Sequence, residues 1–141
     1  MITLLFQVFL GYLTCLGFTI IFNVKGSIKY FAALGGALGV LAFELVLLSA
    51  NVIIANFFAA LVISYYAEIM ARVKKVPVTI LLIPGLIPFV PGGGIYFTML
   101  HFINGNIQEF LNSLVHTVSI AGALAFGTII LSSLARMVYR R

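Results

Sequence analysis

Five apolar runs, each long enough to cross a lipid bilayer, leave this chain few ways to fold. They lie near residues 2–22, 29–49, 52–71, 78–104 and 109–136, and a membrane-spanning helix needs about 20 apolar residues. Only 8% of the residues are charged, whereas soluble domains carry roughly 25%. No basic residue precedes the first run, so we expect a retained helix and not a cleaved signal peptide. The sequence therefore predicts an all-α integral membrane protein, a single transmembrane domain over residues 1–141 with about five transmembrane helices.

The basic residues form three groups, and the connections between these groups carry none. The groups are Lys25 and Lys29; Arg72, Lys74 and Lys75; and Arg136, Arg140 and Arg141. Because basic connections stay on the cytoplasmic side of a membrane, we expect the N-terminus outside and the C-terminus in the cytoplasm. These cations lie between apolar runs and not on a patch interleaved with aromatic residues, which argues against nucleic-acid binding.

Residues 83–98 interrupt the fourth run with three prolines and four glycines. Each proline lacks a backbone N–H and biases the preceding residue toward extended structure, so the helix must break here. Within hydrocarbon, unpaired backbone is tolerated only where protein buries it or where it lines a wet cavity. We therefore expect a fourth helix broken at a binding site. The alternative is a proline-kinked helix whose free groups are satisfied by neighbouring helices.

The two sides of the break offer opposite chemistry. Pro91 suits the first position of a second half-helix, so the amides that follow it would lie at a positive helix end that attracts anions. On the other side, the prolines leave the carbonyls of Ile80, Pro84 and Ile87 without their usual donors. Together these groups suit a zwitterion or a hydroxy acid, and the discontinuous helices of secondary transporters bind substrates in this way.

Four ionisable side chains need an interpretation. Glu44 lies inside the second run, where a carboxylate costs roughly 2.5–3.5 kcal/mol on insertion scales; it is either a proton-coupling or substrate-amine group, or a carboxyl hydrogen-bonded to another helix. His101 and His116 should meet near the outer side from adjacent helices, as part of a proton path or as interfacial histidines. Glu68 precedes Arg72 by one helical turn, which indicates an ordinary ion pair.

Enzymatic and metal chemistry find no support in the sequence. No nucleophile, base and orienting group can be assembled from it, so we do not expect an enzyme. The histidines have no cysteine or carboxylate at ligand spacing, so we expect neither a metal nor a cofactor.

Small and capping residues predict how the helices pack, begin and end. Gly35 and Gly39 form a GxxxG pair on the second helix, which favours close contact with a neighbour. Ser27 and Asn51 precede the second and third helices, and we expect their side chains to cap them. Gly105 is a natural stop for the fourth helix.

Three segments resemble one known family. They are GFTIIFNV (residues 17–24), ALGGALG (33–39) and IPGLIPFVPGGGIYFTM (83–99). They are similar to the threonine/serine exporter (ThrE-like) family, and in particular to its short, YjjB-like membrane subunit, which corresponds to the C-terminal membrane half of the fused exporters. The likeness covers essentially the whole chain. Its most specific part is the Pro-Gly-x-x-Pro-x-x-Pro-Gly-Gly signature of the third segment.

The resemblance implies a function and a partner. It implies a subunit of a two-component secondary transporter that exports small amino acids such as threonine and serine, or related small carboxylates, across the inner membrane. It also implies coupling to the proton motive force and a larger membrane subunit with a cytoplasmic domain. The alternative is a non-transporting assembly or regulatory subunit of a larger membrane partner.

The family signature and the chemistry of the break together give the candidate site. The substrate-binding candidates are Pro84, Gly85, Pro88, Pro91, Gly92, Gly93, Gly94 and Tyr96. The candidate coupling or gating groups are Glu44, His101 and, on the resemblance alone, Asn23.

Overall fold

The computed structural model describes residues 2–138, apart from the side chains of Arg136 and Val138. Its elements, in chain order, are α1 (Ile2–Ile21), α2 (Ile28–Leu47), α3 (Val52–Lys74), α4 (Val78–Leu86), the 3₁₀ helix η1 (Ile87–Phe89), α5 (Gly92–Ile103) and α6 (Ile107–Val138). Arg140 and Arg141, which entered the topology prediction, lie outside the described residues.

The helices match the predicted class. α1, α2, α3 and α6 are each long and apolar enough to cross a membrane, and α4 with η1 and α5 passes the same test only as a pair bent by 49°. The prediction of an all-α membrane protein with about five spans, the fourth broken at the Pro/Gly motif, is therefore confirmed. α3 continues to Lys74 and does not end near residue 71, because the helical backbone extends past its last apolar turn into the basic residues.

α2 lies at the centre of the bundle, in contact with α1, α3 and α4. Its contact face is built from alanine and glycine, and a Cβ added to Gly36 would collide with the sulfur of Cys15 on α1 and lie 3.4 Å from the Cα of Gly85 on α4. A Cβ added to Gly39 would collide with Ile63 of α3. The prediction that these small residues mark close helix contact is confirmed, since only a missing side chain lets the three neighbours approach α2.

Three connections begin with the same backbone turn. The first or second residue after the helix end is left-handed: Asn23 (φ 54) after α1, Lys75 (φ 55) after α3 and Gly105 (φ 70) after α5. At α1 the amide of Val24 donates to the carbonyl of Thr19 and that of Asn23 to Ile20, both at 2.9 Å, which is the Schellman pattern. Asn tolerates this conformation better than most side chains, so Asn23 has a structural reason for its place in the sequence.

The predicted helix starts are confirmed at one position and wrong at another. The Asn51 side chain accepts a hydrogen bond from the amide of Ile54 at 3.0 Å and caps α3. Ser27 occupies the cap position of α2, but its side chain makes no capping bond. Its backbone is already helical (φ −73, ψ −13), whereas a capping side chain needs the extended backbone that Asn51 adopts.

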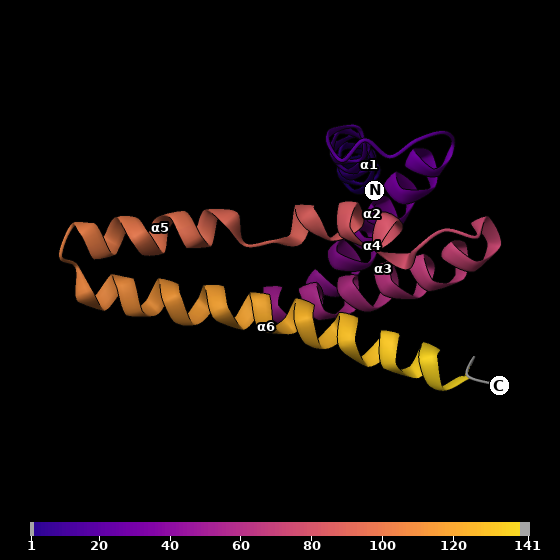
Figure 1. Ribbon diagram of the computed structural model, residues 1–141. Coiled ribbons are helices and arrows are strands. Elements are labelled where there is room, and N and C mark those ends of the chain that lie inside the picture. The colour runs from indigo at the N-terminus through magenta and orange to yellow at the C-terminus, as the bar shows by residue number, and fades with distance from the viewer. Residues whose placement is uncertain (1, 139–141) are drawn as a thin grey trace.

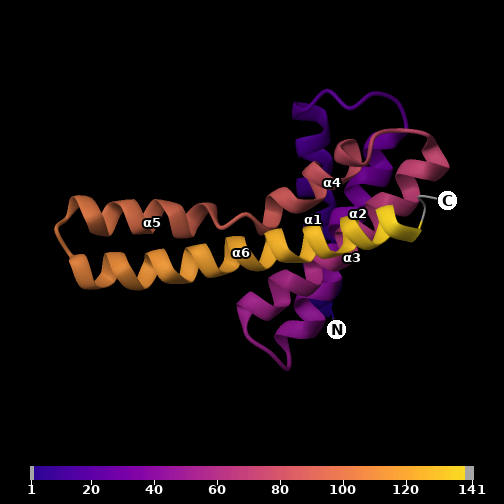
Figure 2. The same ribbon diagram turned by 60° about the horizontal axis from the view of Figure 1, so that its bottom comes forward.

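α5 and the N-terminal half of α6 form a helical hairpin that extends away from the remaining helices (Figure 1, Figure 2). α5 packs against α6, and α6 continues across α3. The outer side of α5 carries exposed large apolar side chains, among them Ile95, Phe97, Met99 and Ile103. The hairpin therefore presents an apolar surface that no other part of the described chain covers.

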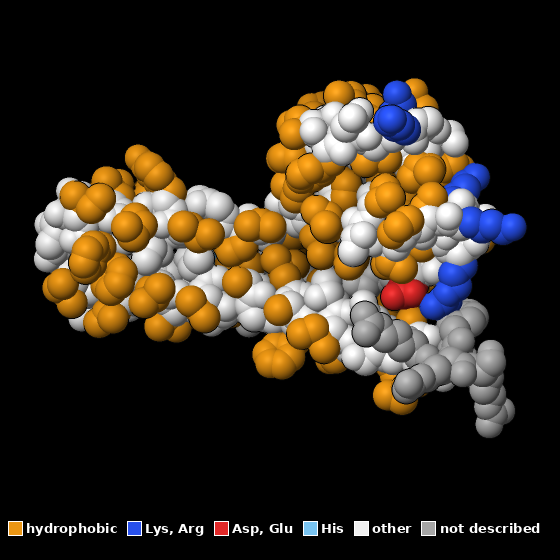
Figure 3. Space-filling view, in the orientation of Figure 1, with side chains coloured by type: hydrophobic (Ala, Val, Ile, Leu, Met, Phe, Trp, Pro, Cys, Tyr) orange, Lys and Arg blue, Asp and Glu red, His pale blue; other side chains and the backbone are white. Residues whose placement is uncertain are grey.

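Charge is confined to one end of the molecule in the view of Figure 3. The visible Lys and Arg side chains gather at the end opposite the hairpin tip, and the surface of the hairpin is largely apolar. The basic residues of the connection after α1 and of the end of α3 thus share one side, as the topology prediction requires.

We predict that Gly36→Ala destabilises the bundle by about 1–3 kcal/mol, because the new methyl group collides with Cys15. Gly122→Ala is the matched control: nothing lies within 4 Å of its added Cβ, so we expect a change below about 1 kcal/mol. Thermal unfolding of the detergent-solubilised protein measures both. Cys15→Ala should rescue much of the Gly36→Ala loss, and an additive double mutant would contradict the proposed contact.

Candidate functional site

The backbone between α4 and α5 turns sharply at Pro91. The Val90 amide donates to the carbonyl of Ile87 at 3.1 Å, and the Gly92 amide donates to the carbonyl of Val90 at 2.7 Å. With φ −75 and ψ 58 at Pro91, this is an inverse γ-turn. The first helical bond of α5 runs from Ile95 to Pro91 at 3.0 Å. Pro91 is thus the N-cap residue of α5 and not its first helical residue, because the γ-turn requires a ψ that is not helical.

The structure corrects one of the predicted free carbonyls and one of the predicted free amides. The Gly92 amide, expected to be free with those of Gly93 and Gly94, donates to the Val90 carbonyl because of the γ-turn. The Ile87 carbonyl is engaged by Val90 because η1 tightens the chain into i→i+3 bonding. The amides of Gly93 and Gly94 have no backbone acceptor within residues 2–138, as expected in the first turn of a helix. The start of α5 therefore carries two free amides, and anion binding there stays a prediction.

A cavity of about 360 Å³ opens at the break, and we call it the break cavity. Its lining residues are Val40, Phe43 and Glu44 of α2, Asn56 of α3, Pro88, Phe89, Val90 and Pro91 of the break, and Ile120 of α6. Glu44, predicted from its position in the second apolar run, therefore shares one cavity with Pro88 and Pro91 of the predicted break.

Two polar side chains face the break cavity. Asn56 is 4% exposed, and its Nδ2 donates to the Val52 carbonyl at 2.8 Å. This bond directs the Oδ1 atom away from the helix backbone, and Oδ1 accepts no hydrogen bond from any described residue. The partly buried Glu44 likewise has no hydrogen bond or ion pair within residues 2–138. Both groups offer acceptor oxygens to whatever enters the cavity.

Phe89 fixes the break against the bundle. Its side chain is 8% exposed and packs in a cluster with Ala59, Ala60 and Ile63 of α3 and with Ile120 of α6. Its ring centroid lies 5.9 Å from that of Phe43 on α2. The wall of the cavity is therefore held by core packing and not by a mobile loop end.

Pro84 and Gly85 lie outside the break cavity. The Pro84 side chain is fully buried, and a Cβ on Gly85 would lie 3.0 Å from Ile63 and 3.7 Å from the Cα of Gly36. These two signature residues thus set the crossing of α4 with α2, and the structure does not bring them to Glu44.

The remaining predicted residues of the break also lie outside the cavity. Gly92 and Gly93 are exposed with nothing within 4 Å of an added Cβ, while Gly94 faces Thr117 of α6. Tyr96 is 64% exposed and stacks edge to face on Phe97, with 5.4 Å between ring centroids. The start of α5 is therefore open on one side and closed by α6 on the other.

A second pocket, of about 410 Å³, lies between α5 and α6, and we call it the histidine pocket. It is lined by Gly94, Phe97, His101, Asn112, Ser113, His116 and Thr117. The prediction that His101 and His116 meet from adjacent helices is confirmed, but they share no lining residue with the break cavity. Within residues 2–138, no group of three His, Cys, Asp or Glu side chains is placed to hold a metal ion.

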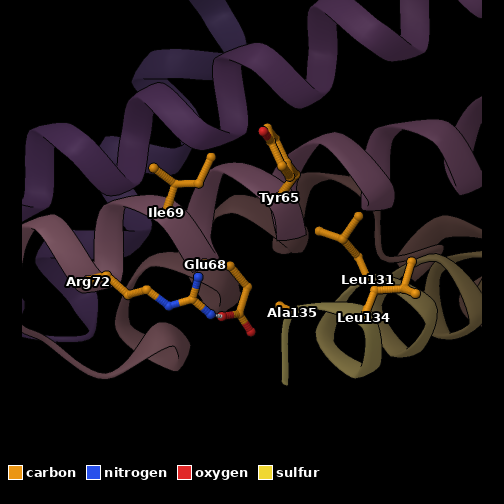
Figure 4. Close-up of a pocket in the computed structure, with 7 residues that line it drawn as sticks. All are labelled: Tyr65, Glu68, Ile69, Arg72, Leu131, Leu134 and Ala135. Atoms are coloured by element: carbon orange, nitrogen blue, oxygen red, sulfur yellow. Dashed lines mark hydrogen bonds and ion pairs between the residues drawn. The ribbon is translucent and has the colours of Figure 1, made fainter. Parts of the chain in front are cut away.

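Two further predicted features lie far from the break along the chain. Asn23 ends α1 at an exposed turn and lines neither the break cavity nor the histidine pocket. The Glu68–Arg72 pair is confirmed at 3.0 Å and lines a pocket of about 300 Å³ between α3 and α6 (Figure 4). Because both side chains belong to adjacent turns of one partly exposed helix, the pair supports α3 locally.

Asn56 was not among the predicted site residues. The available signal was its position: it is the one amide side chain inside the third apolar run, and polar groups within spans usually have a packing or functional reason. The sequence did not show which face of α3 carries it. Only the packing of α2, α3 and the break assigns Asn56 to the cavity.

The family model described as "Threonine/Serine exporter, ThrE" matches residues 7–134 of the chain. The chain belongs to the threonine/serine exporter family. This is a family of transporters, in agreement with the expectation that the chain is not an enzyme. A Haemophilus influenzae relative, described as an uncharacterized protein, is 25% identical over 136 residues, which cover 90% of this chain and 46% of the relative. The chain thus spans less than half the length of that relative. No solved structure matches this chain.

The two neighbouring glycines at the start of α5 make a matched pair for a stability test. Gly94→Ala places a methyl group against Thr117 of α6, and we expect it to cost about 1–3 kcal/mol by forcing the hairpin apart. Gly93→Ala meets open space and should be neutral within about 1 kcal/mol. Thermal unfolding in detergent measures the difference, and equal losses in both variants would contradict the packing of α5 on α6.

Proposed function

We propose that this chain is one subunit of a two-component secondary transporter that exports small amino acids, threonine or serine, or related small carboxylates. The observation that supports this function most directly is the break cavity. It is lined by the interrupted helix and by the acceptor side chains of Glu44 and Asn56, and the free amides of Gly93 and Gly94 follow Pro91. Such interruptions at membrane depth form the substrate sites of secondary transporters. The family of the chain points to the same substrates.

A protein partner completes the site in this proposal. The exposed amide of Gly93 and the unpaired carboxylate of Glu44 cannot face lipid without a large cost. The chain covers 46% of its Haemophilus influenzae relative, which leaves room for another half in such proteins. Five spans give a chain ends on opposite sides of the membrane, so a related half would pair with it in inverted orientation, with the site between the halves. The partner is a larger membrane subunit with a cytoplasmic domain.

The proposal also includes the membrane in which the chain lies, its orientation and the energy source for export. The chain lies in the inner membrane with its N-terminus outside and its C-terminus in the cytoplasm, since its basic connections belong on the cytoplasmic side. Export is driven by protons, and the ionisable groups in or beside the spans that are available for this are Glu44 in the break cavity and His101 in the histidine pocket.

The alternative function is a non-transporting assembly subunit of a larger membrane protein. The exposed apolar hairpin of α5 and α6 is the feature that favours it, because such a surface is suited to holding a partner in the membrane. The two functions differ in what the break contributes. In a transporter the break binds substrate; in an assembly subunit it only shapes the hairpin.

Efflux of radiolabelled threonine from cells that lack other exporters tests the proposal. We expect efflux when the chain is produced together with the larger family member from the same cell, and none when either is produced alone. Full export by the chain alone would defeat the two-subunit claim.

Gly93→Leu separates the two functions. The site around Gly93 is open within the chain, so the variant should fold and still co-purify with its partner. If the break binds substrate, threonine efflux should fall to background. Unchanged efflux, or loss of co-purification, would favour the assembly function.

A further inference from the structure

We propose that the break cavity is a site for a small positively charged group, held by the Asn56 Oδ1 atom and the Glu44 carboxylate. The group is either the ammonium of an amino-acid substrate or a coupling cation. This inference deepens the proposed function, on which it rests, by assigning a charge preference to the cavity and a role to Asn56.

The side chains that line the cavity offer more acceptors than donors. Among its nine lining residues, Glu44 and Asn56 are the polar side chains, and the rest are apolar. The Asn56 Nδ2 group already donates one hydrogen to the Val52 carbonyl at 2.8 Å. One Nδ2 hydrogen of Asn56 remains, so the side chains of the lining offer three acceptor oxygens and one N–H. A positively charged group that brings several protons satisfies more of these atoms than an anion does.

The backbone of the break also offers few N–H donors to the cavity. Pro88 and Pro91 line the cavity and have no N–H to donate. The Val90 amide, a third lining group, is bound to the Ile87 carbonyl at 3.1 Å. A carboxylate inside the cavity would find none of these donors and would face the Glu44 carboxylate. The amides that suit an anion belong to Gly93 and Gly94, beyond Pro91 and outside the cavity lining.

The Asn56 side chain can accept a hydrogen bond from a charged group in the cavity. It is 4% exposed, yet its Oδ1 accepts no hydrogen bond from the described residues. The Oδ1 atom can therefore accept a hydrogen bond from a donor that enters the cavity. At about 360 Å³ the cavity falls within the range of roughly 300–1,000 Å³ typical of small-molecule sites.

Equilibrium binding to the purified complex of this chain with its larger subunit tests the proposal, with thermal stabilisation as the readout. The three probes are threonine, 2,3-dihydroxybutyrate, which replaces the ammonium by a hydroxyl group, and sodium chloride against choline chloride. Stabilisation by threonine and not by the dihydroxy acid identifies the substrate ammonium and selects amino acids over amine-free carboxylates. Stabilisation by sodium in the absence of threonine identifies a coupling cation.

Two variants connect the binding to the named residues. Asn56→Leu and Glu44→Gln should each weaken binding of the effective probe about tenfold or more, as expected for a hydrogen bond to a charged group. Glu44→Gln keeps its shape and removes no contact of the fold, so it remains informative if Asn56→Leu unfolds. The matched controls are Asn104→Leu and Glu109→Gln at exposed positions of the hairpin, which should bind like the native chain.

The results that overturn the proposal are specific. They are equal stabilisation by threonine and the dihydroxy acid together with no stabilisation by sodium, or native affinity for the effective probe in both Glu44→Gln and Asn56→Leu. Because the measurement is made without transport, cation binding in a complex that exports nothing would refute the proposed function and leave the cation site standing.

Discussion

Backbone groups in hydrocarbon must be paired, and the three prolines of the break make full pairing impossible within one helix. The rest of the structure compensates for that defect. η1 and the γ-turn at Pro91 recover two hydrogen bonds, at 3.1 and 2.7 Å, by tightening the chain. Phe89 then ties the turn to the core formed by α3 and α6. The amides of Gly93 and Gly94 remain without a backbone acceptor, and they follow directly after Pro91, which lines the break cavity.

The contact of Gly36 with Gly85 determines the position of the break along α2. Because neither residue has a side chain, α2 and α4 approach so closely that a Cβ added to Gly36 would lie 3.4 Å from the Gly85 Cα. This close crossing places the end of α4 beside the second half of α2, where Glu44 lies. The signature thus contains two kinds of residue: Pro84 and Gly85 fix the crossing, while Pro88 and Pro91 shape the cavity. A sequence motif shared across a family need not act as one site.

Local rules predicted the local features of this fold. The apolar runs, the broken fourth span, the Asn51 cap and the Glu68–Arg72 pair depend only on residues close in sequence, and the structure confirms each. Features that depend on three-dimensional packing were missed. The face on which Asn56 lies and the open position of Tyr96 follow from how α3 and α5 are placed, which no local pattern encodes. The engaged carbonyl of Ile87 is a local i→i+3 bond, and it was missed because the sequence did not indicate the 3₁₀ turn. The meeting of His101 with His116 was predictable because a short connection joins their two helices.

The length of α6 has a consequence for how the protein responds to its membrane. Its 32 residues extend about 48 Å, whereas the hydrocarbon core is about 30 Å thick. A helix with such an excess tilts, and the angle changes with bilayer thickness. α5 packs on this helix, and Ile120 of the same helix forms one wall of the break cavity. The thickness of the bilayer therefore acts directly on the helix that carries one wall of the break cavity.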